Sequence, residues 1–569
     1  MILDMLVDIP DLPGLITKRT VKGTTYVYYE YGREYDPKRK YTLPKRATIG
    51  KLGAGGRLVP NENFRKYLPS IPLPDEGVRS RVSSCIRIGT FLLVRKLVAE
   101  SRLELSLDGI FNERGYGLLL DLAAYSIVTE NNAAQYYPDY TYNHPVFTPR
   151  MRRYSDSTVS RFLAEIDRDQ VSEFLERWNM NREKKERIYI SYDSTNKNCQ
   201  AGDIDMVEYG HAKDSRGLPV FNYSVAYDQN NCEPLFYEEY PGSIVDVSQL
   251  QFMLMKAEGY GYGNVAFILD RGYFSRDNIA FMDRHGFDFV IMVRGMRKLV
   301  ADVVNGVRCT FESNRDNYVK NYGVYAVTVK TKLYAEDTKE RFLHVIYNSS
   351  KLTSERMSVD AKIDRMERFL ENCENREVAI PKVVEDYFEL FYDGSRFLYG
   401  KVRNDAVGRE LDLCGYFVIV TSEKMSAAEA ISIYKGRDST EKLFRGDKSY
   451  LGNRSLRVGS GEAASSKIFI EFIALVIRNR IHSRLKNAKL KNEKKQNFMN
   501  VNAAVRELEK IEMIRRPDGK YTLDHAVTAT QKEVLRAFGL DENFVMDEAA
   551  KLGAEIARFE KEAQDEDWM

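Results

Sequence analysis

The chain contains 569 residues, of which 43% are hydrophobic and 30% are charged, and its formal net charge is +2. This composition is typical of a soluble globular protein, and the length is too great for one hydrophobic core, so we expect several domains. The six cysteines are scattered without a C-x-x-C pair, which argues against a zinc ribbon and against a disulfide framework.

Strand-forming residues dominate the N-terminal part of the chain. Residues 24–31 are β-branched and aromatic, and residues 45–53 end in turn residues. These patterns predict a small β module over residues 1–77.

A helical region is predicted next, over residues 78–182, where apolar residues recur at helical spacing. Residues 154–163 resemble the second helix of a helix-turn-helix, whose polar N-terminal residues would face a DNA groove. A capped helix in an ordinary bundle is the alternative. We therefore predict a helical DNA-binding region in this part of the chain.

The pattern changes to strands after residue 187. Three strands with hairpin connections come first, and helices then alternate with two further strands. The predicted strands cover residues 188–193, 222–227, 233–240, 264–270 and 287–293. This order is that of an RNase H-like fold, so we predict the first part of a catalytic core over residues 183–295.

The core is predicted to be interrupted. Short strand-like runs and one charged helical stretch predict a β-rich insertion over residues 296–410. The second part of the core follows over residues 411–486, and residues 487–569 are predicted to form a C-terminal helical region. The predicted fold class is α/β in a multi-domain (α+β) chain.

Two aspartates are predicted to end strands of this core. Asp193 lies at the end of the first strand and Asp270 at the end of the fourth. In an RNase H-like sheet the first and fourth strands are neighbours, so the two carboxylates would meet where α/β sheets place ligand-binding groups. For either residue alone, a turn-forming Asp is an equally good explanation.

A third acid lies in a segment with the pattern Y-x2-R-x3-E-x6-K. Its four marked residues are Tyr434, Arg437, Glu441 and Lys448. At about 100° per residue, these side chains fall within roughly 60° of one helical face. Gly446 is the residue that would end this helix before Lys448. The alternative is a solvated helix in which Arg437 and Glu441 form an ion pair.

The acids and the basic residues together point to phosphate chemistry. Carboxylates are the donors that hard divalent cations prefer, and two such ions about 3.5–4 Å apart can promote a phosphoryl displacement. Residues 478–495 add eight Lys and Arg residues against Glu493 alone. Basic patches on a nearly neutral protein favour a DNA partner.

The three acidic blocks resemble those of DDE transposases from bacterial insertion sequences, in particular the YREK-signature group of the insertion-sequence-four type. The resemblance covers about residues 185–485. It implies that Asp193, Asp270 and Glu441 are catalytic and that they hold two Mg²⁺ or Mn²⁺ ions. A β-rich insertion before the block with the third acid is also a feature of this group.

The resemblance further implies a reaction and its partners. Tyr434, Arg437 and Lys448 would contact the transposon end. The enzyme would bind double-stranded DNA as a homodimer, cut the ends of the terminal inverted repeats and join them to target DNA in cut-and-paste transposition. An RNase H-like nuclease without strand transfer and a domesticated DNA-binding protein are the alternatives.

The sequence predicts no membrane partner. The N-terminal residues lack the basic start of a secretion signal. The longest apolar run, residues 468–477, is interrupted by Glu471 and is too short to cross a bilayer. We therefore expect a cytoplasmic protein that acts on the DNA of the bacterial nucleoid.

Overall fold

The computed structural model describes residues 6–71, 73, 83–182, 187–199, 204–209, 218–452, 455–491, 499–516 and 520–566. The chain divides into two compact units, Met1–Ser83 and Ser84–Met569. The predicted domain boundary after residue 77 lies outside the described ranges, and the one after residue 182 falls where a described range ends. Among the described helices, none is long and apolar enough to cross a membrane.

The first unit is a four-stranded antiparallel sheet with one short helix. Its elements are β1 (Ile16–Val21), β2 (Thr24–Asp36), β3 (Tyr41–Leu52), β4 (Leu58–Pro60) and α1 (Glu62–Tyr67), and the strands pair in chain order. Val27, Ile49, Leu58 and Phe64 form its buried core. The β-branched and aromatic residues of β2 thus form a strand because each has a neighbouring strand and core to pack against.

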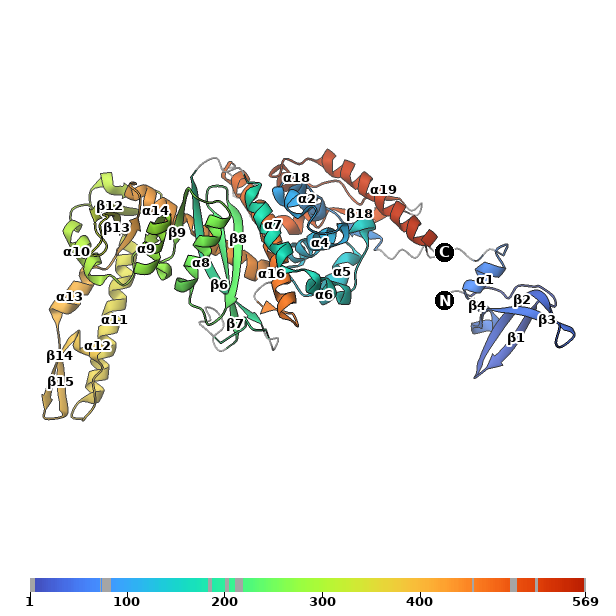
Figure 1. Ribbon diagram of the computed structural model, residues 1–569, viewed down its shortest axis with the longest axis horizontal. Helices are drawn as coiled ribbons and strands as arrows, with labels where there is room; N and C mark the ends of the chain where they lie inside the picture. The colour runs from blue at the N-terminus through green and yellow to red at the C-terminus, as the bar shows by residue number, and fades with distance from the viewer. Residues whose placement is uncertain are drawn as a thin grey trace. The chain divides into compact units, whose positions relative to one another are not determined.

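A large mixed sheet forms the centre of the second unit (Figure 1). Its strands lie in the order β11-β12-β13-β16-β10-β9-β6-β7-β8, and β17 pairs with the end of β6. In chain order, the first five strands of this sheet are β6 (Ile188–Cys199), β7 (Val220–Asp228), β8 (Glu233–Pro241), β9 (Val265–Leu269) and β10 (Asp288–Met292). The first and fourth, β6 and β9, are parallel neighbours, as predicted. The fold is therefore mixed α/β.

Four helices connect these strands or cover the sheet near the candidate site. They are α8 (Asp246–Gly259), α9 (Arg276–His285), α14 (Ala427–Gly436) and α15 (Asp438–Tyr450). The sheet strand before α14 is β16 (Tyr416–Thr421), which runs antiparallel to β10. Ala427, Ile431 and Tyr434 of α14 pack on the buried Ile268 and Val290 of the sheet. This apolar face fixes α14 above the strand that leads to Asp270.

The segment predicted as an insertion contributes both to the sheet and to a projection from it. The strands β11 (Tyr318–Val319), β12 (Val324–Thr331) and β13 (Arg341–Tyr347) extend the central sheet beyond β16. Figure 1 shows the long helix α11 reaching away from this sheet beside the hairpin β14–β15. The other elements here are α10 (Arg297–Val307), α11 (Ser349–Cys373), α12 (Lys382–Glu385), β14 (Phe388–Asp393), β15 (Arg396–Val402) and α13 (Asn404–Asp412).

The helical region and the C-terminal region pack together. The strand β5 (Cys85–Arg87) pairs with β18 (Glu512–Arg515), which pairs with β19 (Tyr521–Leu523). The long helix α16 (Gly461–Lys491) is buried along much of its length between α4, α6 and β8. The remaining elements are α2 (Gly89–Ala99), α3 (Arg102–Leu107), α4 (Glu113–Thr129), α5 (Tyr137–Tyr142), α6 (Asp156–Glu165), α7 (Arg168–Met180), β17 (Ser455–Leu456), α17 (Val501–Leu508), α18 (Ala529–Arg536) and α19 (Glu542–Glu566). The helical region and the C-terminal region, which are far apart in the sequence, therefore share the small sheet β5-β18-β19.

Candidate active site

The register of β6 against β9 brings two predicted acids to the same level of the sheet. Tyr192 of β6 pairs with Leu269 of β9. Asp193 directly follows Tyr192, and Asp270 directly follows Leu269. Asp270 directly follows the end of β9, as predicted. The prediction that Asp193 ends its strand is wrong, because β6 continues to Cys199.

The strand continues because its polar residues find buried partners. Residues 194–198 stay paired with β7, and Asn196 and Asn222 bond to each other through their side-chain amides. Lys197 is fully buried and forms ion pairs with acids from other elements. From the sequence alone this polar run suggests a turn, because the partners that stabilise it as a strand come from distant parts of the chain.

The predicted YREK helix is two helices that meet at Arg437. The helix α14 ends at Gly436 and α15 begins at Asp438, so the prediction of one continuous helix is wrong. With its amide oxygen toward Arg437, the Gln229 side chain accepts the Arg437 backbone N–H at 2.9 Å and donates to the Ile433 carbonyl at 3.2 Å. These are the two groups that would bond to each other in a regular α-helix, so Gln229 replaces one helical hydrogen bond.

The second half of the pattern stays helical through its glycine. Gly446 is buried inside α15, which continues to Tyr450, so Lys448 is presented from a helix. Lys448 is half-buried and lies two turns beyond Glu441.

The structure brings the three acids together around one guanidinium group. Arg437 Nη1 lies 3.5 Å from Asp193 Oδ2, and Arg437 Nη2 lies 3.7 Å from Asp270 Oδ1 and 2.8 Å from Glu441 Oε1. The exposed side-chain fractions rise from 18% for Asp193 through 36% for Asp270 to 52% for Glu441. The acids thus line an opening to solvent, with a cation of the chain itself between them.

The surroundings of Arg437 favour its charged form. Burial opposes the charge, but Tyr434, Asp270, Asp193 and Glu441 outweigh it and raise the pKa of the guanidinium. Tyr434 donates to Asp270 Oδ1 at 3.4 Å, and burial, together with that carboxylate, raises its pKa well above the usual value. Tyr434 therefore acts as a neutral donor at this site.

Two buried polar ties hold α15 against β6. Thr440, next to Glu441, lies with its hydroxyl 2.9 Å from that of Ser191, two residues before Asp193. Farther along the same pair of elements, Lys197 Nζ lies 2.8 Å from Asp447 Oδ2.

The second tie extends to α16. Lys197 Nζ also lies 2.6 Å from Glu471 Oε2, and the three charged side chains are at most 2% exposed. Burial opposes the charge of Lys197, but Asp447 and Glu471 together raise its pKa. Burial raises the pKa of Glu471 to about 7, against the opposing effect of Lys197. The cluster connects the strand that carries Asp193 to the helix that carries Glu441.

Residues 188–477, slightly more than half of the chain, match the family model described as the transposase DDE domain. The chain belongs to this family. All three acids and the whole YREK pattern lie within the matched residues. The comparison with curated proteins found no match.

Two solved structures of transposases are similar to this DDE transposase-family protein. One is the cryo-EM structure of the piggyBac transposase synaptic complex with hairpin DNA, with 9% identity, a TM-score of 0.35 and coverage of 77% of each chain. The other is the Mos1 transposase paired-end complex with the left transposon end, with 12% identity, a TM-score of 0.14 and coverage of 42% of this chain and 69% of that one. Similarity at this level does not place individual residues.

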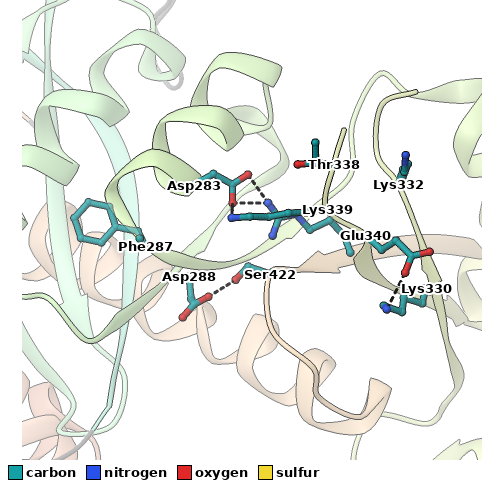
Figure 2. A pocket seen from close by; sticks show the side chains of 11 residues that line it. Asp283, Phe287, Asp288, Lys330, Lys332, Thr338, Lys339, Glu340 and Ser422 are labelled. Atoms are coloured by element: carbon teal, nitrogen blue, oxygen red, sulfur yellow. Dashed lines mark hydrogen bonds and ion pairs between the residues drawn. The ribbon is translucent and has the colours of Figure 1, made fainter. Parts of the chain in front are cut away.

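A separate pocket has a volume of about 580 Å³, and Figure 2 shows side chains that line it. It lies at the other end of the sheet from the acids. Asp288, which lines it, begins β10, whereas Asp270 follows the end of β9, and the two strands are parallel. Three of its four basic lining residues are paired: Lys330 with Glu340, and Arg341 and Lys339 with Asp283. Its position at the opposite end of the strands separates it from the candidate active site.

The described residues contain no group of three or more His, Cys, Asp and Glu side chains arranged to hold a metal ion. The position between the acids is instead taken by the Arg437 guanidinium. Sequence reasoning also missed Gln229 and Lys197, which position Arg437 and α15. In the sequence, Lys197 is seen only as one residue of the polar run that follows Asp193, and nothing there indicates that it is buried.

Proposed function

We propose that this DDE transposase-family protein is the transposase of a bacterial insertion sequence of the insertion-sequence-four, YREK-signature type. It binds the terminal inverted repeats of its element, cleaves the DNA there and joins the freed 3′ ends to target DNA by direct transesterification. One observation carries the proposal: Asp193, Asp270 and Glu441, far apart in the sequence, surround one guanidinium within the matched domain.

We describe the catalytic core as RNase H-like. The strand order β8-β7-β6-β9-β10, with β7 antiparallel and β9 parallel to β6, supports this proposal. The long segment between β10 and β16 then interrupts the core, and α15 with Glu441 returns to it.

The donor set at the site fits Mg²⁺ or Mn²⁺. Asp193, Asp270 and Glu441 would hold the ions, because hard divalent cations prefer carboxylate oxygens and the site already accommodates positive charge. When two ions are bound there, they would supply activation of the attacking oxygen and stabilisation of the leaving oxygen.

The other YREK residues have separate roles in this proposal. Arg437 and Lys448 hold phosphates of the transposon end near the acids, and Tyr434 donates a hydrogen bond while remaining neutral. We also propose that the active complex is a homodimer that works on nucleoid DNA in the cytoplasm.

The test separates chemistry from binding. Asp270→Asn and Glu441→Gln should each abolish Mg²⁺-dependent cleavage of an inverted-repeat duplex while preserving its binding, because affinity depends on basic contacts to phosphates. Cleavage without strand transfer would support the nuclease alternative. Binding without cleavage by the wild-type protein would support the DNA-binding alternative. Loss of DNA binding by a well-folded Asp270→Asn variant would contradict the proposed division of roles.

We propose that sequence-specific end recognition lies before residue 180. The first unit, residues 1–83, carries 15 Lys and Arg residues against 9 Asp and Glu residues, whereas the rest of the chain carries 70 against 74. Such an excess of positive charge suits contact with DNA phosphates. Removal of residues 1–83 from the full chain should lower the preference for inverted repeats over scrambled DNA in a footprinting assay. An unchanged preference would exclude the first unit and leave the helical region 84–180 or the basic residues 478–495 as the part that reads the ends.

A further inference from the structure

A small cavity lies beside the helix that carries Glu441. It has a volume of about 200 Å³ and is enclosed by α15, α16 and the turn after β7. Ser439 and Lys442, which line it, flank Glu441 in the sequence. A drug-sized ligand takes about 300–1,000 Å³, so the cavity suits a smaller group.

The charge of the cavity lining has one sign. No Asp or Glu is among its described lining residues, which include four basic side chains. These are Lys442 from α15 and Arg478, His482 and Lys486 from α16. Within the described residues, none of the four has a carboxylate at ion-pair distance. The lining therefore attracts an anion that the chain itself does not supply.

Arg478 is built into the wall of the cavity. Its Nη2 donates to Asn502 Oδ1 at 2.8 Å, and its guanidinium lies 5.0 Å from the centroid of the Tyr450 ring, so both of these contacts are with neutral groups. Burial lowers the pKa of Arg478 to about 10, against the opposing effect of Tyr450, Glu130 and Asp447. A Cβ on Gly446 would lie 2.9 Å from Arg478 Nη1, so the glycine in α15 leaves room for this guanidinium.

The adjoining cavity provides a contrast. It has a volume of about 360 Å³ and shares Asn231, Cys232 and Ser483 with the first. Its arginines are already paired with acids of the chain. The pairs are Arg102 and Arg480 with Glu233, Arg182 with Asp228, and Arg484 with Glu100. The arginines of the adjoining cavity thus form ion pairs within the chain, whereas, among the described residues, the basic residues of the cavity between α15 and α16 do not.

We propose that the cavity between α15 and α16 binds a phosphodiester group of the DNA backbone, with Lys442, Arg478 and Lys486 as its ligands. This inference rests on the proposed function and adds to it a phosphate site outside the YREK pattern. Lys442 follows Glu441 on α15, so a phosphate held here lies against the same helix that carries the third acid. Charge-assisted hydrogen bonds to a phosphate are strong where the donors are partly desolvated.

The test measures the salt dependence of DNA binding. Lys442→Gln and Lys486→Gln change exposed side chains and should preserve the fold. Lys489→Gln is the matched control, because Lys489 is exposed on the same helix but does not line the cavity. The probe is a fluorescein-labelled DNA duplex of scrambled sequence, and fluorescence anisotropy gives Kd over a series of salt concentrations.

Each cavity variant should lower the slope of log Kd against log salt by about 0.9, the value for one phosphate contact. The Lys489→Gln slope should equal that of the wild type. Equal slopes for cavity and control variants would overturn the proposal. A second outcome would also overturn it. If inorganic phosphate alone raises the Tm of the wild type but not of the cavity variants, while the variants keep the wild-type slope with DNA, the cavity binds free phosphate and not the DNA backbone.

The result is separable from the proposed function. Cleavage of an inverted-repeat duplex with Mg²⁺ by the wild-type protein, and its loss in Glu441→Gln, tests the role of the acids without reference to the cavity. A wild-type protein that cleaves DNA and cavity variants with unchanged slopes would reject the phosphate site and leave the catalytic proposal intact. If the cavity variants have reduced slopes but the wild-type protein does not cleave DNA, the phosphate site would stand and the catalytic proposal would be rejected.

Discussion

The position of Arg437 between the three acids predicts that its removal strengthens metal binding. Its guanidinium nitrogens lie 2.8–3.7 Å from Asp193, Asp270 and Glu441. A divalent cation held by the same carboxylates must either lie beside this positive charge or displace it. We therefore expect Arg437→Ala to bind Mn²⁺ more tightly than the wild type in the absence of DNA.

The size of the effect follows from the charges. Two unit charges 4 Å apart interact by about 1 kcal/mol when water screens them, so a divalent ion beside Arg437 is opposed by about 2 kcal/mol. We use the screened value because Asp270 and Glu441 are both partly exposed. Since 1.4 kcal/mol is tenfold in affinity, the variant should bind Mn²⁺ about 30-fold more tightly.

Electron paramagnetic resonance of free Mn²⁺, recorded during a titration of the DNA-free protein, measures this affinity. Lys435→Ala is the control. Lys435 is an exposed residue of α14 just before the break, and its substitution removes the same charge as Arg437→Ala. Arg437→Ala should also weaken binding to the transposon end, since we assign that residue a phosphate contact. Mn²⁺ affinity equal to that of the wild type would refute the idea that the guanidinium competes for the site.

Three further outcomes are expected. Gly436→Ala should cost about 1 kcal/mol of unfolding free energy, because the added Cβ would clash with the Gln229 side-chain amide and displace it. Gln229→Ala in the same chain should remove most of this cost, and additive effects of the two substitutions in chemical denaturation would contradict the proposed role of Gln229. Lys197→Met should cost about 3–5 kcal/mol in the same assay, because two buried carboxylates lose their cation; a cost below 1 kcal/mol would show that they are not paired as described. Burial and three nearby cations lower the pKa of His482, so a bound phosphate should raise that pKa. DNA affinity should therefore be highest below the His482 pKa of the free protein and should fall as the pH rises through the His482 pKa of the complex. His482→Gln should remove that part of the pH dependence.

The parts of the site that local patterns specify could be predicted from the sequence. The apolar run 265–269 followed by Asp270 predicts a strand that ends at an acid, and the structure has that arrangement. The neighbourhood of β6 and β9 follows from the order of strands and helices, because parallel neighbours in such a sheet need a crossover connection.

The errors concern residues whose partners come from elsewhere in the chain. Asp193 lies within a strand because the polar residues after it are paired with β7, α15 and α16, none of which is visible from local sequence. The break at Arg437 depends on Gln229, which is about 200 positions away in the chain. Helical periodicity gives the correct face for Glu441 but cannot reveal that an amide replaces one hydrogen bond of the helix.

The break and the internal cation together explain how three carboxylates can lie close to one another. Adjacent carboxylates repel one another unless a positive charge lies among them. Arg437 supplies that charge, and the break that Gln229 maintains places it at the junction of two helices, where its backbone is held by a neighbour and not by α14 alone. In the proposed function the same guanidinium holds a phosphate of the transposon end. A phosphate that draws Arg437 outward leaves the three carboxylates without their internal cation, so engagement of DNA and affinity for divalent ions are linked through one side chain. By linkage, each must strengthen the other to the same degree.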